Sequence, residues 1–98
     1  MPASHLETVK AAMFAAGAGK VGNYDCCAWQ TQGQGQYRPL PESNPFSGEL
    51  DKLQIANEFK VEMVCEKQFL AAATQALKQN HPYEEVAYAV LALQAVEP

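Results

Sequence analysis

The residue types best suited to chemistry lie together in one short segment, His81-Pro82-Tyr83-Glu84-Glu85. An imidazole and a carboxylate are ligands that divalent metals accept, so His81 and Glu85 form a partial metal set. In the alternative, structural interpretation, His81 is favoured at a helix C-terminus, Pro82 ends that helix and Tyr83 covers the edge of the core. One segment rarely supplies a full coordination sphere, so the structural role is favoured and a ligand or metal contact stays open.

A second candidate is Arg38, the only arginine, which lies in a loop rich in glycine and glutamine. A guanidinium can clamp a carboxylate or a phosphate, although it more often pins a loop to backbone carbonyls or to an acidic neighbour. We therefore predict a ligand site at Arg38, His81, Tyr83 and Glu84 for a small anion or a divalent metal ion. No residue is predicted to be catalytic, because no serine or cysteine lies in a nucleophile elbow.

Two other motifs have structural explanations. The run Gly17-Ala18-Gly19-Lys20-Val21-Gly22 matches the dinucleotide-binding pattern, but a helix precedes it and a strand follows, the reverse of the required order. It predicts a helix end and a tight turn. Cys26, Cys27 and Cys65 form neither an even disulfide framework nor a Cys-x-x-Cys pair, so we expect reduced thiols.

Length and composition limit the possible classes of protein. Ninety-eight residues with 48% hydrophobic and 18% charged side chains predict one globular domain. The net charge of −4 and the scattered lysines argue against nucleic-acid binding. No apolar run is long enough for a membrane span, and the start of the sequence shows no signal peptide, so we expect a cytoplasmic protein.

Periodicity and turn residues place the elements that would position these side chains. A capping box at Ser4 and a helical stripe up to Gly17 predict the first helix. The remaining expected elements are a strand at 25–31, a turn or ribbon tip at 32–36 within a Gly/Pro-rich loop at about 32–52, a strand at 57–65, a helix at 67–79 and a strand at 86–93. In the second strand, alternation places Phe59, Val61 and Met63 on the core side and Glu58 on the solvent side.

The two halves of the chain repeat a helix followed by a strand, but the first helix lacks the strand that precedes the second. A ferredoxin-like split βαβ sandwich, with both helices on one face of an antiparallel sheet, needs about six residues of strand before Pro2. Either a strand upstream of Met1, another chain or a rearranged sheet must occupy that central position. The last strand is apolar on both faces, so both faces must be covered.

Three stretches of the chain form a specific combination. They are Gly17-Ala18-Gly19-Lys20-Val21-Gly22-Asn23-Tyr24, the stretch from Gly33 to Gly48 with its Tyr37-Arg38-Pro39-Leu40 and Asn44-Pro45-Phe46 motifs, and His81-Pro82-Tyr83-Glu84-Glu85-Val86-Ala87-Tyr88. This combination resembles the domain inserted in the NGG-interacting-factor family, which also occurs alone in YqfO-like small bacterial proteins. Members of that family usually carry a strand before the position of Met1, from which this chain departs.

The resemblance implies a PII- and CutA-like fold, commonly assembled as oligomers, and no established activity for the free-standing domain. In full-length members the two-metal centre belongs to flanking halves, so metal-dependent hydrolysis does not transfer. We expect a non-enzymatic binding or regulatory module with its site at a subunit cleft. We expect a homo-oligomer. The analogy with PII and CutA proteins favours a trimer, and a dimer is the alternative. Two other functions remain open: an enzyme using His81 with Glu84 as its orienting carboxylate, and a protein-interaction domain that caps a larger assembly.

Overall fold

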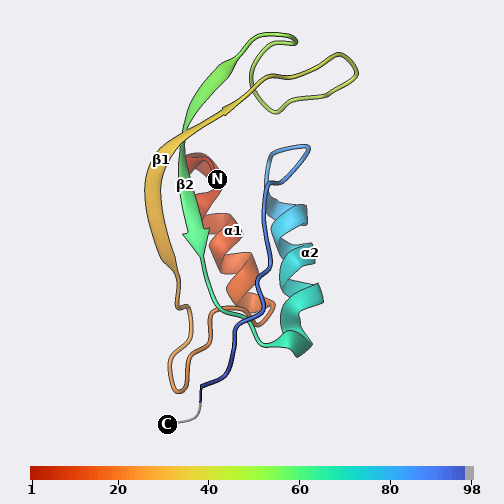
Figure 1. Cartoon of the computed structure of the whole chain (residues 1–98). Coiled ribbons are helices and arrows are strands. Elements are labelled where there is room, and N and C mark those ends of the chain that lie inside the picture. Colours follow the sequence, from red (N-terminus) through yellow and green to blue (C-terminus); the bar gives the residue numbers. More distant parts are fainter. Residues whose placement is uncertain (97–98) are drawn as a thin grey trace.

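The computed structural model describes residues 1–96 and is a small α+β structure (Figure 1). Its elements in chain order are α1 (Ala3–Ala15), β1 (Trp29–Tyr37), β2 (Gln54–Glu62), the short 3₁₀ helix η1 (Lys67–Phe69) and α2 (Leu70–Asn80). The two helices lie side by side, and a long twisted hairpin of β1 and β2 extends beyond them. In the described part of the chain, neither helix has the length and apolar character needed to cross a membrane.

The helices begin and end close to the predicted positions, although their caps differ. α1 is preceded by Pro2 and has no side-chain cap, so the predicted capping box at Ser4 is wrong. The Ser4 hydroxyl instead lies 2.8 Å from Nδ1 of His5. Gly17 and Gly19 follow α1 with φ of +114° and +80°, which confirms that the glycine motif is a helix end and turn.

The hairpin contains the main departure from the expected strands. β1 starts at Trp29 and ends at Tyr37, opposite Glu62 and Gln54 of β2 respectively. The Gly/Gln tract predicted as a turn is therefore strand, and the loop starts after Tyr37. Glycine is depleted in strands because it has no side chain to pack, so the composition of this tract favours a turn although the tract pairs with β2.

Gly35 shows why a glycine is needed within this strand. A methyl group built on its Cα would collide with the carboxylate of Glu58, meeting Oε1 first and lying 3.0 Å from Cδ. A methyl group at Gly33, two residues away on the same strand, would meet nothing within 4 Å. The missing side chain at Gly35 therefore creates the space in which Glu58 lies over the hairpin.

The core is formed mainly between the helices and the following turn. The buried apolar residues are Leu6, Val9, Ala18, Ala73 and Leu77. Phe59, Val61 and Met63 of the β2 segment are half-buried while Lys60 and Glu62 are exposed, which confirms the predicted alternation over this stretch. Glu58 departs from it, because it is half-buried rather than exposed.

The predicted strand at 86–93 is not formed among the described residues. The segment runs extended past β2 and α2, but it belongs to no sheet, and the only sheet within residues 1–96 contains β1 and β2 (Figure 1). A strand exists only where a neighbouring backbone accepts its hydrogen bonds, and a cavity of about 1,900 Å³ separates this segment from the edge of β2. The expected four-stranded ferredoxin-like sheet is therefore present only as the β1–β2 hairpin.

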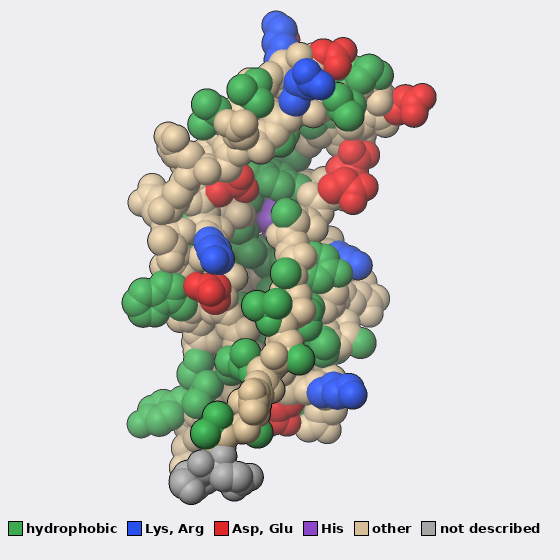
Figure 2. All heavy atoms as spheres, viewed as in Figure 1, with side chains coloured by type: hydrophobic (Ala, Val, Ile, Leu, Met, Phe, Trp, Pro, Cys, Tyr) green, Lys and Arg blue, Asp and Glu red, His purple; other side chains and the backbone are tan. Residues whose placement is uncertain are grey.

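The molecule exposes more surface than a compact monomer of the same mass. Its accessible surface is 7428 Å², whereas a compact monomer of 10.7 kDa exposes about 5,500 Å². Its radius of gyration is 15.2 Å, against about 13 Å for a compact chain of this length. Green apolar side chains are spread over the visible face in Figure 2, and large apolar residues such as Leu91 and Leu93 are among the most exposed.

We predict that Gly35→Ala lowers the free energy of unfolding by about 1 kcal/mol, because the new methyl group displaces the Glu58 carboxylate from its ion pair with the Met1 ammonium. Gly33→Ala is the matched control. It should change stability by less than about 1 kcal/mol, and towards greater stability, because it only restricts the unfolded chain.

Urea unfolding of both variants measures this difference. In a Glu58→Ala background the collision is absent, so Gly35→Ala should then behave like Gly33→Ala. Equal effects of the two glycine substitutions in the wild-type background would show that Glu58 does not lie over Gly35.

Candidate functional site

A cavity of about 580 Å³ lies between the far half of the hairpin, the loop after β1 and the end of α2. We call it the aromatic cavity, because the rings of Tyr37, Phe46, His81 and Tyr83 line it. All five residues predicted to bind a ligand or metal contribute to its wall: Arg38, His81, Tyr83, Glu84 and Glu85. The sequence prediction therefore gathered residues that are neighbours in space, although they come from two separate segments.

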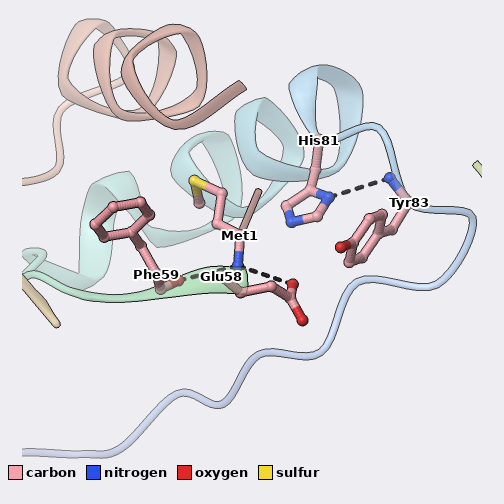
Figure 3. Close-up of polar contacts among 5 residues, drawn as sticks. All are labelled: Met1, Glu58, Phe59, His81 and Tyr83. Atoms are coloured by element: carbon pink, nitrogen blue, oxygen red, sulfur yellow. Dashed lines mark hydrogen bonds and ion pairs between the residues drawn. The ribbon is translucent and has the colours of Figure 1, made fainter. Parts of the chain in front are cut away.

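His81 is placed by the end of α2. It is the C-cap residue, with extended backbone, and its N–H still donates to Leu77 at 2.9 Å. Its Nδ1 accepts the N–H of Tyr83 at 3.1 Å (Figure 3). Burial lowers the pKa of His81 below its usual 6.5, and the positive charge of the Met1 ammonium lowers it further.

This contact determines which nitrogen of His81 carries the proton. A neutral imidazole has one N–H and one acceptor nitrogen, and here Nδ1 is the acceptor. Nε2 must therefore be the protonated nitrogen. Figure 3 shows that the second ring nitrogen points to the side where Met1 and Glu58 lie. The His81 ring thus presents a hydrogen-bond donor.

Tyr83 joins the aromatic rings into one cluster. Its ring centroid lies 4.8 Å from that of His81, 6.1 Å from Tyr37 and 6.3 Å from Phe46. Burial, followed by the nearby Glu58 carboxylate, raises the pKa of Tyr83 to about 12. The phenol therefore keeps its proton at any physiological pH and acts as a neutral donor on the cavity wall.

Met1 and Glu58 also line the aromatic cavity. The Met1 ammonium lies 3.2 Å from Oε2 of Glu58 and donates to the carbonyl of Phe59 at 2.9 Å (Figure 3). The side chains of Met1 and Glu58 are 8% and 18% exposed, so the ion pair is shielded from solvent. A partly buried pair is screened less by salt than an exposed one, which strengthens the contact.

Sequence analysis did not identify Met1, Tyr37, Phe46 or Glu58 as members of the site. Glu58 carried a misleading signal, because the alternation of β2 placed it with the exposed charges. Its true place follows from Gly35, whose missing side chain makes room for the carboxylate. A glycine paired near an acidic residue in a long hairpin was the only sequence signal available.

The remaining predicted residues lie at the rim. The carboxylate of Glu84 accepts the N–H of Asn44 at 3.0 and 3.2 Å, so it anchors the loop after β1 to the segment after α2. Arg38 and Glu85 are exposed. The structure therefore brings Glu84 to a loop backbone rather than to the His81 ring.

A metal ion fits these residues poorly. Within residues 1–96, no three histidine, cysteine, aspartate or glutamate side chains converge on one point. Binding through Nε2 would require the proton to move to Nδ1, which already accepts the Tyr83 N–H. The arrangement suits a hydrogen-bond acceptor better than a cation.

Comparison with known proteins places the chain among larger relatives. It is 41% identical over 88 residues to the GTP cyclohydrolase 1 type 2 homolog of Bacillus subtilis and 38% identical over 93 residues to that of Mycobacterium leprae, matches that span 90% and 95% of the chain. No family model matches the chain. The crystal structure of a Bacillus cereus protein related to NIF3 superposes on 97% of it with a TM-score of 0.80 and 33% identity.

The chain spans about a quarter of each of these proteins: 24% of the Bacillus subtilis and Mycobacterium leprae relatives and 24% of the Bacillus cereus chain. These matches cover nearly the whole chain, and sequence and structure agree on them. The homologues of this protein are NIF3-related proteins, to which it corresponds over that quarter of their length.

Proposed function

We propose that the protein is a non-enzymatic binding module whose aromatic cavity takes a small, flat, largely apolar ligand that carries a hydrogen-bond acceptor. The observation that carries this proposal is the His81 Nε2–H among aromatic rings in a cavity of about 580 Å³. Ligand pockets in proteins are of this size and combine an apolar lining with few placed polar groups.

The electrostatics narrow the ligand further. Glu58 is paired with Met1 and Glu84 with the Asn44 backbone, while the exposed guanidinium of Arg38 lies at the rim. An aromatic carboxylate would place its ring against Tyr83 and its oxygens towards His81 and Arg38. Of the two ligands predicted from the sequence, the proposal therefore retains the small anion and drops the divalent metal ion.

The proposal also covers the type of domain and its role. We infer a PII- and CutA-like domain with a regulatory role, and the match to NIF3-related proteins along nearly the whole chain supports this inference. A cyclohydrolase activity is not part of the proposal, since three quarters of the relatives so named have no counterpart in the match.

The enzymatic alternative receives less support from the geometry. General acid–base catalysis by His81 would need a carboxylate to orient its ring. The ring is held by the Tyr83 backbone, and Glu84 is engaged by Asn44. The protein-interaction alternative is supported by the exposed apolar surface.

Benzoate is a suitable probe of the aromatic cavity, with benzamide as its neutral counterpart. We expect benzoate to shift the NMR signals of His81, Tyr83 and Phe46 in a saturable manner. His81→Ala should weaken binding by roughly tenfold or more, which is the effect of losing one hydrogen bond to a charged group.

Tyr24→Ala is the control, because Tyr24 is an aromatic residue that is 75% exposed and does not line the cavity. Benzoate shifts located elsewhere on the protein, or equal affinity in His81→Ala and wild type, would contradict the proposed site. Stronger binding of benzamide would show that the acceptor is not an anion.

Stability should depend on the protonation of His81. Because burial lowers its pKa in the folded state, the unfolded chain binds the proton more readily. The contribution of neutral His81 to the free energy of unfolding should therefore be fully present above pH 6.5. It should be lost as the pH is lowered through the folded-state pKa. Urea unfolding between pH 7.5 and 5 should show this fall in wild type and His5→Gln, and a smaller one in His81→Gln.

A further inference from the structure

We propose that the loop at 38–53 is a lid over the aromatic cavity and that the Glu84 carboxylate is the latch that holds it closed. The inference rests on the proposed function, because it concerns how a ligand enters and leaves the same cavity. In Figure 1 the loop projects from the far end of the hairpin, above the segment that follows α2. The loop supplies part of the cavity wall, including Leu40 and Phe46, and the segment after α2 supplies another part, including Tyr83.

The first argument is that the loop is a self-contained unit. β1 and β2 stop pairing at Tyr37 and Gln54, so no neighbouring strand holds the residues between them. The backbone N–H of Asp51 donates to the carbonyl of Pro39, which closes the neck of the loop. The Tyr37 hydroxyl lies 2.9 Å from the carbonyl of Ser47 and ties the loop to the end of β1. A loop with joined ends is compact, so it can move as one body on the end of the hairpin.

The second argument is the contact that fixes this unit to the rest of the molecule. Both carboxylate oxygens of Glu84 accept the backbone N–H of Asn44, at 3.0 and 3.2 Å. Within residues 1–96 this is the only hydrogen-bonded contact between the loop and a part of the chain outside the hairpin. The contact is exposed to solvent, so water can replace it when the loop moves away. One reversible contact therefore decides whether the loop is closed.

The third argument is the apolar part of the closure, which Phe46 provides. Its ring centroid lies 6.3 Å from that of Tyr83 and 5.6 Å from that of His5 in α1, within the range of favourable ring contacts. Phe46 is nevertheless 53% exposed, so its release uncovers little buried surface and leaves no void in the core. The loop can open without disturbing the packing of the two helices.

Binding and closure are coupled in this arrangement. A ligand in the aromatic cavity contacts the loop only when the loop is closed, so it binds the closed form more tightly than the open form. The latch therefore raises the affinity for the ligand, and the bound ligand stabilises the latch by the same factor.

Solvent exchange of the Asn44 amide, measured by NMR, tests the latch without any ligand. We expect Glu84→Ala to speed this exchange by roughly tenfold, the effect of losing one hydrogen bond to a charged group, and to weaken the nuclear Overhauser contacts between Phe46 and Tyr83. Glu84→Gln should have a smaller effect, because its amide oxygen is still an acceptor. Glu85→Ala is the matched control, since it removes the neighbouring exposed carboxylate but not the contact with Asn44.

Benzoate tests the coupling of the latch to the cavity. It should slow the exchange of the Asn44 amide in the wild type. Its dissociation constant should be roughly tenfold higher for Glu84→Ala than for Glu85→Ala, which has the same net charge.

The outcomes separate the lid from the proposed ligand. Equal exchange of the Asn44 amide in Glu84→Ala and Glu85→Ala, or contacts between Phe46 and Tyr83 that persist in Glu84→Ala, would overturn the lid even if benzoate binds. Equal affinity of both variants for benzoate would overturn the coupling. Release of the loop in Glu84→Ala without any binding of benzoate to the wild type would support the lid and contradict the proposed ligand.

Discussion

The arrangement of the other elements depends on the backbone hydrogen bonds at the two edges of β2. One edge is fully paired with β1, and in the part of the chain that the structure describes the other edge is paired only where Met1-Pro2 meets Glu58 and Phe59. A backbone edge left open beside an apolar space is a costly arrangement, because its polar groups must find partners and its neighbours must be covered. In the described residues the extended 86–93 segment lies beside this edge without joining the sheet.

The sequence predicted those parts of the fold that depend on local pattern. Both helices, the strand around Phe59 and the turn after Gly17 follow from periodicity and from residues with special backbone preferences, and these were confirmed. The extent of β1 could not be predicted, since a Gly/Gln tract becomes a strand only when a partner such as β2 pairs with it. The prediction of a strand at 86–93 was wrong for the complementary reason: the segment has the pattern of a strand, but a cavity separates it from the open edge of β2.

The candidate site was predictable to the same degree. His81, Tyr83 and Glu84 stand in one short segment, so composition alone indicated them. Tyr37 and Phe46 come from the far end of the hairpin and the loop, and only the tertiary fold places them against Tyr83. The hydrogen bond from Tyr83 to His81 changes the chemistry expected from that segment, because it makes an apparent metal ligand a donor.

An affinity tag joined to Met1 would convert its ammonium into an amide and remove the positive charge that faces Glu58. The added residues would also emerge beside Phe59, next to the unpaired backbone edge of β2. A fusion at the carboxyl end leaves the Met1 contact untouched. The position of a purification handle therefore decides whether the ion pair between Met1 and Glu58 is kept.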